Sequence, residues 1–283
     1  MLCGKRESLR RDKHAVAPAV STVILTAVVV VMILVAATYA STFLDKRLAE
    51  NEYSANKQFM LTTGLQLDDI AWTIGRTQTI RYSSRYGTMT VKPAVIRYTV
   101  TVDGTPLFSE DIGVTGILMF NMPVSSYSVG NGYFERVVPA YSDSILLEGT
   151  SASACHVLCV EKLPMNDGSY TRIVLAPTIR LMQTTISRGT SNTTYYKFYL
   201  PRLVPSNEQR YLSQSVTLVG ENVTKYSVLG NNQVTIDVEF LESDFNNDFF
   251  QFARLSETVS MEPNSNPVVE FYVGTVSVKI GDV

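Results

Sequence analysis

Two cysteines and a histidine lie close together in the sequence, at Cys155, His156 and Cys159. Thiolate and imidazole groups bind zinc, but structural zinc sites normally use four ligands and this cluster supplies at most three. On a strand, His156 would point to the face opposite both cysteines, and residues four apart would be about 13 Å apart, too far for a disulfide. We predict no metal site here. The cysteines either pair across a turn or stay buried as small apolar residues.

A second group of candidate ligands is an alternating acidic series. Its members are Glu242, Asp244, Asn246 and Asp248. The EF-hand pattern for calcium is not met, because Phe249 and Leu255 stand where glycine and glutamate are needed when Asp244 comes first. We expect an exposed acidic loop or the start of a helix, and a calcium role stays open as the alternative.

Signatures of enzyme active sites are scarce in this chain. The sequence has two histidines and contains no nucleophile elbow, phosphate-binding loop or zinc-protease helix. A glycosidase-type carboxylate pair can come from any two positions, so the sequence does not exclude catalysis. We expect a protein that is not an enzyme and needs no cofactor.

The composition predicts an ordered protein with a large core and no nucleic-acid surface. Of the 283 residues, 45% are apolar and 18% are charged, and the net charge is −2. This average hides a division along the chain. The first fifteen residues carry +3, and the remaining 268 carry −5. No basic stripe of the kind that binds nucleic acid is evident.

The elements that must position these groups begin with a long apolar segment. No residue from Ala15 to Ala40 is charged. This uncharged segment is longer than the roughly 20 apolar residues that cross a membrane as a helix. The segment is too long for the apolar part of a secretory signal. Because the basic residues all precede it, we expect the N-terminus in the cytoplasm and the rest of the chain outside.

The helical pattern continues beyond the membrane length. Leu44, Leu48, Ala55 and Phe59 are expected to form one apolar stripe, and Gly64 is the first stop signal. A helix from about residue 20 to residue 63 would be about 65 Å long. About half of it would extend beyond the bilayer as an amphipathic stalk, which an ordinary anchor does not need.

The residues before the apolar segment carry a specific resemblance. The stretch KHAVAPAV, residues 13–20, resembles the class III signal peptides of archaeal type IV pilins, which a membrane peptidase cuts on the cytoplasmic side. Mapped onto this chain, the cut falls between Ala15 and Val16, with Lys13 and His14 before it and Pro18 third in the mature protein. A proline in the first helical turn costs no hydrogen bond.

Two features depart from the wider pilin pattern. His14 stands between the basic residue and the cut, which leaves the cut position open by one residue. Val20 occupies the fifth mature position, where bacterial pilins carry glutamate, and this fits the archaeal branch better. The resemblance covers about sixty residues.

The resemblance implies a structural subunit, a major or minor pilin, of an archaeal type IV pilus-like filament at the cell surface. Its partners would be the prepilin peptidase, the membrane, and copies of itself or related pilins that pack through the N-terminal helix. The precursor would lie in the cell membrane and the mature protein in an extracellular filament. The alternative is an uncleaved single-pass membrane protein whose ectodomain binds a ligand or partner.

From Thr77 onward the pattern changes to a period of two, typical of strands. Strands are expected at residues 94–102, 157–163, 170–175, 215–219, 226–229, 233–241 and 268–280. Asp103-Gly104 and Asn166-Asp167-Gly168 are hairpin turn signals. The fold class is therefore α+β, with a long N-terminal helix followed by a mainly antiparallel β-sandwich, the head type that archaeal pilins also have.

The expected organisation has four parts: a basic leader at 1–15, a long helix at 16–64, a helical connection at 65–76 and one extracellular head at 77–283. Trp72 is expected to pack where the stalk meets the head.

Two sequons give possible N-glycosylation sites at Asn192 and Asn222 if the head faces outside. An aromatic cluster at Tyr195, Tyr196, Phe198 and Tyr199 serves either core packing or adhesive contacts.

Overall fold

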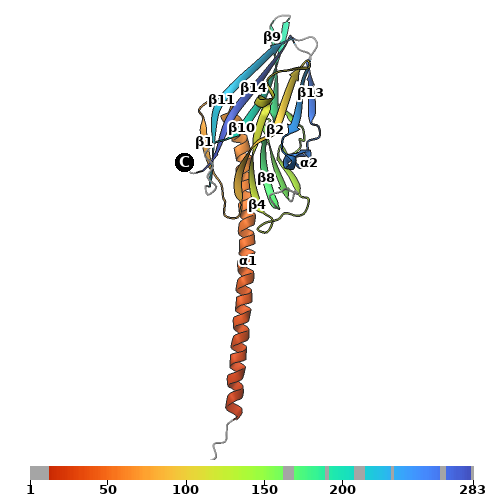
Figure 1. Cartoon of the computed structure of the whole chain (residues 1–283). Helices are drawn as coiled ribbons and strands as arrows, with labels where there is room; N and C mark the ends of the chain where they lie inside the picture. Colours follow the sequence, from red (N-terminus) through yellow and green to blue (C-terminus); the bar gives the residue numbers. More distant parts are fainter. Residues whose placement is uncertain are drawn as a thin grey trace, which may run out of the picture. The chain divides into compact units, whose positions relative to one another are not determined.

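A computed structural model describes residues 13–161, 169–188, 191–206, 214–230, 233–261 and 266–281. Helix α1 (Lys13–Ala71) forms from the apolar segment and its amphipathic continuation. The chain divides into two compact units between Leu48 and Ala49. The second unit therefore contains the last part of α1 together with all the described strands, and it is called the head below (Figure 1).

The described strands of the head form a six-stranded and an eight-stranded sheet. The six-stranded sheet contains β1 (Thr77–Arg81), β6 (Leu146–Glu148), β9 (Ile179–Arg188), β10 (Ser191–Pro205), β11 (Ser215–Leu229) and β14 (Asn266–Ile280). The eight-stranded sheet contains β2 (Thr88–Val102), β3 (Thr105–Pro106), β4 (Val114–Pro123), β5 (Phe134–Val138), β7 (Cys155–Glu161), β8 (Tyr170–Pro177), β12 (Gln233–Phe240) and β13 (Ser256–Ser260). Short helical turns are η1 (Glu110–Gly113), η2 (Ser243–Phe245) and α2 (Asn247–Phe250).

Strand order explains how distant segments meet. The six-stranded sheet runs β1-β11-β14-β10-β9-β6, and the other runs β13-β12-β2-β4-β8-β7-β5 with β3 beside β2. Most pairs are antiparallel, but β10 pairs with β14 and β6 with β9 in parallel. The Asp103-Gly104 turn is confirmed, because β2 and β3 pair across it and both turn residues have positive φ. The other turn signal, 166–168, lies outside the described residues.

The expected sandwich needs correction, because the sheets curl into half-barrels around two separate cores (Figure 1). A simple sandwich has a single core between two layers. Here β4, β7 and β8 are buried on both faces. One face, with Leu118 and Val157, packs in the core that includes α1, and the other, with Met119 and Leu158, packs in a core that contains no residue of α1.

The long strands bend where their pairing is irregular. The pairing of β2 with β4 shifts between Lys92 and Ile96, and that of β11 with β14 shifts between Gly220 and Asn222. A bulge of this kind bends the bulged strand and increases its twist. The bulge also explains why two expected strands, 215–219 and 226–229, are one continuous strand, β11.

Helix α1 does not end at Gly64, where the sequence pattern predicted its end. It continues to Ala71, and the chain then turns through Gly75, whose φ is +80°. The segment expected as a separate helical connection is therefore the last two turns of the same helix.

Candidate functional site

The part of α1 that belongs to the head, Ala49–Ala71, is called the docked segment. Its buried positions recur every three or four residues along one face of the helix. They are Ala49, Glu52, Tyr53, Asn56, Phe59, Met60, Thr63, Gly64, Leu67, Ile70 and Ala71. The predicted stripe was wrong in detail, because Ala55 is exposed and the buried face includes Glu52 and Asn56.

Glu52 holds the loop between β1 and β2 against the helix. Its carboxylate is 5% exposed and accepts hydrogen bonds from the backbone N–H groups of Arg85, Tyr86 and Gly87, all at 3.0 Å at their shortest. One turn later, Asn56 donates from its amide nitrogen to the carbonyl of Ser83 at 2.7 Å. A buried carboxylate needs such donors, since an unpaired charge is costly to bury.

Lys57 joins the helix to the edge strand β5. Its Nζ lies 2.6 Å from a carboxylate oxygen of Glu135, which also accepts a hydrogen bond from the Tyr133 hydroxyl. Burial raises the pKa of Glu135, but the hydrogen bonds from Lys57 and Tyr133 outweigh burial and lower that pKa overall. The Glu135 carboxylate therefore stays ionised at neutral pH, and its ion pair with Lys57 fixes one side of the helix.

Gly64 lets the helix approach β7 and β8 closely. A Cβ at this position would lie 2.7 Å from Cys155 Sγ and 3.3 Å from Leu175 Cδ1, which is too near for a real side chain. Gly220 and Gly274 do the same for the end of the helix, because a Cβ on either would meet carbonyl oxygens of residues 70–73. These glycines are packing positions in the head rather than stop signals.

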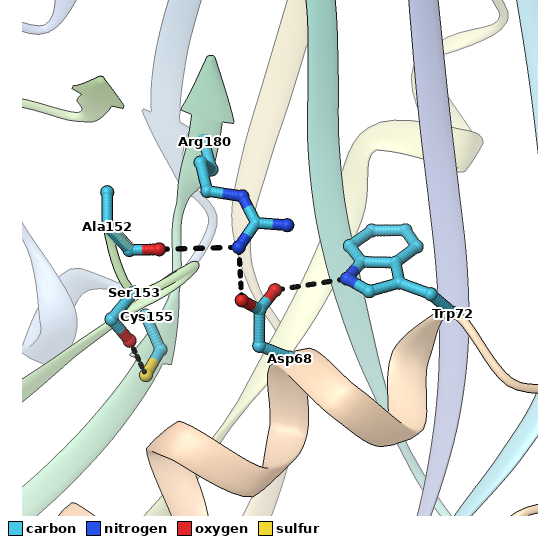
Figure 2. A network of polar contacts seen from close by, with 6 residues as sticks. All are labelled: Asp68, Trp72, Ala152, Ser153, Cys155 and Arg180. Atoms are coloured by element: carbon cyan, nitrogen blue, oxygen red, sulfur yellow. Dashed lines mark hydrogen bonds and ion pairs between the residues drawn. The ribbon is translucent and has the colours of Figure 1, made fainter. Parts of the chain in front are cut away.

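Asp68 and Trp72 connect the end of the helix to the six-stranded sheet. Figure 2 shows the Asp68 carboxylate between Arg180 and Trp72: Arg180 donates to Oδ2, and Trp72 Nε1 donates to Oδ1 at 3.0 Å. The Arg180 guanidinium also lies 4.9 Å from the ring centre of Tyr199, which contacts Trp72 edge-on at 5.2 Å. Trp72 therefore packs at the end of the helix within the head, in keeping with its expected place.

These contacts define the helix-docking site: Glu52, Lys57, Gly64, Asp68 and Trp72 with their partners. These contacts hold the docked segment against the strands of the head through ion pairs, hydrogen bonds and close packing. Glu52, Lys57 and Asp68 each have a partner from a different strand or loop, and Trp72 donates to Asp68.

The other part of α1, called the apolar segment (Val20–Leu44), has the opposite character. It is long and apolar enough to cross a membrane, and its side chains are exposed. Its hydroxyl groups bond to carbonyls of the same helix: Thr26 donates to Thr22 O at 2.6 Å and Thr42 to Thr38 O at 2.8 Å. These groups are therefore satisfied without water, as an apolar environment requires.

The predicted cleavage junction, Ala15 and Val16 with Lys13, His14 and Pro18, lies in the first turns of α1. It stays a prediction from the sequence. The two sequon asparagines are exposed, Asn192 on β10 and Asn222 on β11. Both are therefore open to modification, and their use stays a prediction as well.

The cysteine and histidine cluster lies on β7, whose alternation separates the groups as predicted. Cys155 and Cys159 belong to the core that includes α1 and are free thiols, whereas His156 packs edge-on against Phe252 of the other core. Burial raises the pKa of Cys155 to about 12 and that of Cys159 to about 11. Burial, followed by the nearby Arg136, lowers the pKa of His156 to about 3. Among the described residues, no three His, Cys, Asp or Glu side chains converge as a metal site.

The acidic series forms the start of a helix, one of the two structures expected for it. The Asn246 side chain caps α2 by accepting a hydrogen bond from the Asp248 N–H at 2.9 Å. Glu242 forms an ion pair with Lys92 at 2.7 Å. Calcium binding by this series finds no support within the described chain.

The aromatic cluster of β10 divides between the two faces of the strand. Tyr196 and Phe198 are buried in the core without α1. Tyr195 and Tyr199 point the other way and are half-buried, with Tyr199 stacked on Tyr272 at 5.1 Å. Core packing and surface contacts are therefore both present in this one cluster.

Comparisons of this chain with known protein families, curated proteins and solved structures found no match.

Proposed function

We propose that this chain is a structural subunit, a major or minor pilin, of an archaeal type IV pilus-like filament. The observation that carries the proposal is that two consecutive segments of one helix, α1, have opposite surroundings. The docked segment is part of the head's own core, and the apolar segment has exposed side chains along its length. A filament would bury the apolar segment among copies of itself, with a large gain from the hydrophobic effect.

The head's dependence on the helix favours this proposal over an ordinary anchor. A membrane anchor can be joined to its ectodomain by a linker, because the two parts need no common structure. Here Met60, Leu67 and Ile70 are fully or almost fully buried in the head. The head therefore cannot release the helix without losing part of its core, which suits a subunit that carries load through the helix.

The chemistry of the apolar segment also supports packing between helices. Small residues at Ala27, Ala36, Ala37 and Ala40 permit close approach of a neighbouring helix. The serine and threonine hydroxyls that bond within the helix can be buried beside another helix at little cost.

Assembly in this proposal follows cleavage between Ala15 and Val16. The basic leader of +3 holds the precursor with its N-terminus in the cytoplasm, and the prepilin peptidase removes it. The helix then leaves the membrane and enters the filament, and the head lies on the outside of the cell. Exposed asparagines at 192 and 222 would carry glycans there.

The direct test is the N-terminal residue of protein recovered from cells. We expect a mature chain that starts at Val16 or the adjacent residue, and filaments that contain it. An intact leader on a protein that stays in the membrane would contradict the filament and favour the single-pass alternative.

A thiol cross-link provides the second test. Ala36→Cys places an exposed cysteine in the apolar segment, while Cys155 and Cys159 are buried. We expect oxidation of intact filaments to link neighbouring subunits through this thiol. Each variant offers one accessible thiol, so the linked product is a dimer. Tyr141→Cys, at a fully exposed position of the head, is the matched control and should not give the same yield of disulfide-linked dimer.

A further inference from the structure

A hollow of about 540 Å³ lies beside the edge strand β13. Its walls are the loop before β6, the segment that leads into β13 and the first three residues of β13. The polar residues that line it are Asp143, Ser144, Arg254, Ser256, Glu257 and Thr258. This volume is within the range of small-molecule sites, and it lies in neither the helix-docking site nor the apolar segment.

The walls of the hollow are held by hydrogen bonds. The Ala253 N–H donates to the Asp143 carbonyl at 3.1 Å, which joins the two walls. The Arg136 guanidinium donates to the carbonyls of Phe250 and Gln251 at 2.9 and 3.0 Å and fixes the segment before Ala253. The hollow is therefore preformed, which reduces the entropy lost when a ligand binds.

One carboxylate of the hollow is positioned by its neighbours. The Ser144 hydroxyl lies 2.6 Å from Glu257 Oε1 and accepts a hydrogen bond from the Leu146 N–H at 3.1 Å. The Leu146 carbonyl is also 2.6 Å from this hydroxyl, but one proton serves only one acceptor, and the charged carboxylate is the stronger. Ser144 therefore orients Glu257 at the wall.

The lining favours a neutral ligand that both donates and accepts hydrogen bonds. Two carboxylates, Asp143 and Glu257, disfavour an anion, and Arg254 disfavours a strongly cationic one. No three acidic or histidine side chains of the described residues converge to hold a metal ion. Carboxylates, hydroxyls and a guanidinium together match a polyhydroxylated molecule.

An exposed aromatic ring stands next to the hollow in sequence. Tyr141, two residues before Asp143, is fully exposed. An exposed tyrosine ring offers an apolar face on which the C–H face of a sugar packs, with a hydroxyl for hydrogen bonding. We propose that this hollow and the Tyr141 loop form a binding site for a neutral mono- or disaccharide. The proposal does not depend on filament assembly.

The test is saturation-transfer NMR on the full chain in a detergent without a sugar headgroup. The probes are lactose, maltose, N,N′-diacetylchitobiose and their monosaccharides, each titrated to about 10 mM. We expect at least one probe to bind saturably with a Kd of about 1 mM or tighter. Saturable binding by none of them would overturn the proposal.

Variants locate the binding. Tyr141→Ala should weaken it about fivefold and Glu257→Gln about tenfold or more. Leu229→Ala, also at an exposed apolar side chain but on β11 and outside the lining of the hollow, should leave it unchanged. Tyr141 is fully exposed, so its loss should not affect folding, which the unfolding curve of the same sample checks. Binding that survives both Tyr141→Ala and Glu257→Gln would contradict the site. A response to calcium chloride alone at the same residues, without sugar binding, would show a cation site and also overturn it.

Discussion

The two parts of α1 have opposite relations to the rest of the chain. In the docked segment, charged and polar side chains such as Glu52, Lys57 and Asp68 each have a partner from the head. In the apolar segment, large side chains such as Leu34 are about 60% exposed, and hydroxyls such as those of Thr26 and Thr42 bond to carbonyls of the same helix. The difference teaches that head stability should depend on one part of the helix and assembly on the other.

The largest effect on the head is expected from Glu52→Ala. The change leaves three backbone N–H groups without this acceptor, of which that of Gly87 is buried and those of Arg85 and Tyr86 are partly buried, and each unsatisfied buried donor costs about 1–3 kcal/mol. We expect the free energy of unfolding to fall by about 3–5 kcal/mol in total, since the loop can relax in part. Urea unfolding of the full chain in micelles, followed by fluorescence of the single tryptophan, Trp72, measures it. The exposed Glu221→Ala is the control and should change stability by less than about 0.5 kcal/mol; equal effects of the two changes would contradict the assigned role of Glu52.

The next prediction compares the truncation of one side chain in each of the two parts of the helix. Met60→Ala removes a fully buried side chain and should cost the head about 2–4 kcal/mol. Leu34→Ala removes an exposed side chain and should leave the head's unfolding midpoint unchanged. Under the proposed function, the reverse order is expected for filament yield in cells, provided that the weakened head still folds at the growth temperature. Loss of head stability from Leu34→Ala would break the comparison.

A smaller effect is expected from added bulk. Gly64→Val places side-chain atoms against Cys155 and Leu175 and should cost about 1–3 kcal/mol, because the core must move to accept them. Ala36→Val adds similar bulk in the apolar segment and should have no effect on the head. Thiol reactivity of Cys155 provides a second measurement, since a displaced helix uncovers it. A Gly64→Val protein as stable and as unreactive as the parent would show that the close approach at Gly64 is not required.

The sequence predicts the apolar segment and several strands, such as β8, β12 and β14, because these depend on local periodicity. It misses three long strands, β4, β9 and β10. It does not predict the docked face, since a charged residue such as Glu52 is normally assigned to solvent and its acceptor role depends on a loop more than thirty residues away. The prediction for Gly64 was wrong for a related reason: the sequence alone does not distinguish a glycine that permits close packing from a glycine that ends a helix. The pairing of β10 with β14 in parallel also has no local signal, because it joins strands more than seventy residues apart.

The smallest predicted effect is a pH dependence of stability that arises in one core and can be measured from the other. Strand β7 presents Cys155 and Cys159 to the core that includes α1 and His156 to the other core. Because burial lowers the pKa of His156 to about 3, the unfolded chain binds a proton between about pH 6.5 and pH 3 that the folded chain excludes. Stability from this residue is therefore complete above about pH 6.5 and declines as the pH falls, by about 1.4 kcal/mol at pH 5.5.

His156→Gln removes this titration, so we expect the variant to lose less stability than the parent between pH 7.5 and pH 5.5. Trp72 reports the measurement from the core that includes α1, on the opposite side of β7. If its signal follows the acid loss set by His156, the two cores unfold as one, and the docked segment is held by the whole head rather than by its own half-barrel. An identical pH dependence in parent and variant would show that His156 does not couple protons to folding.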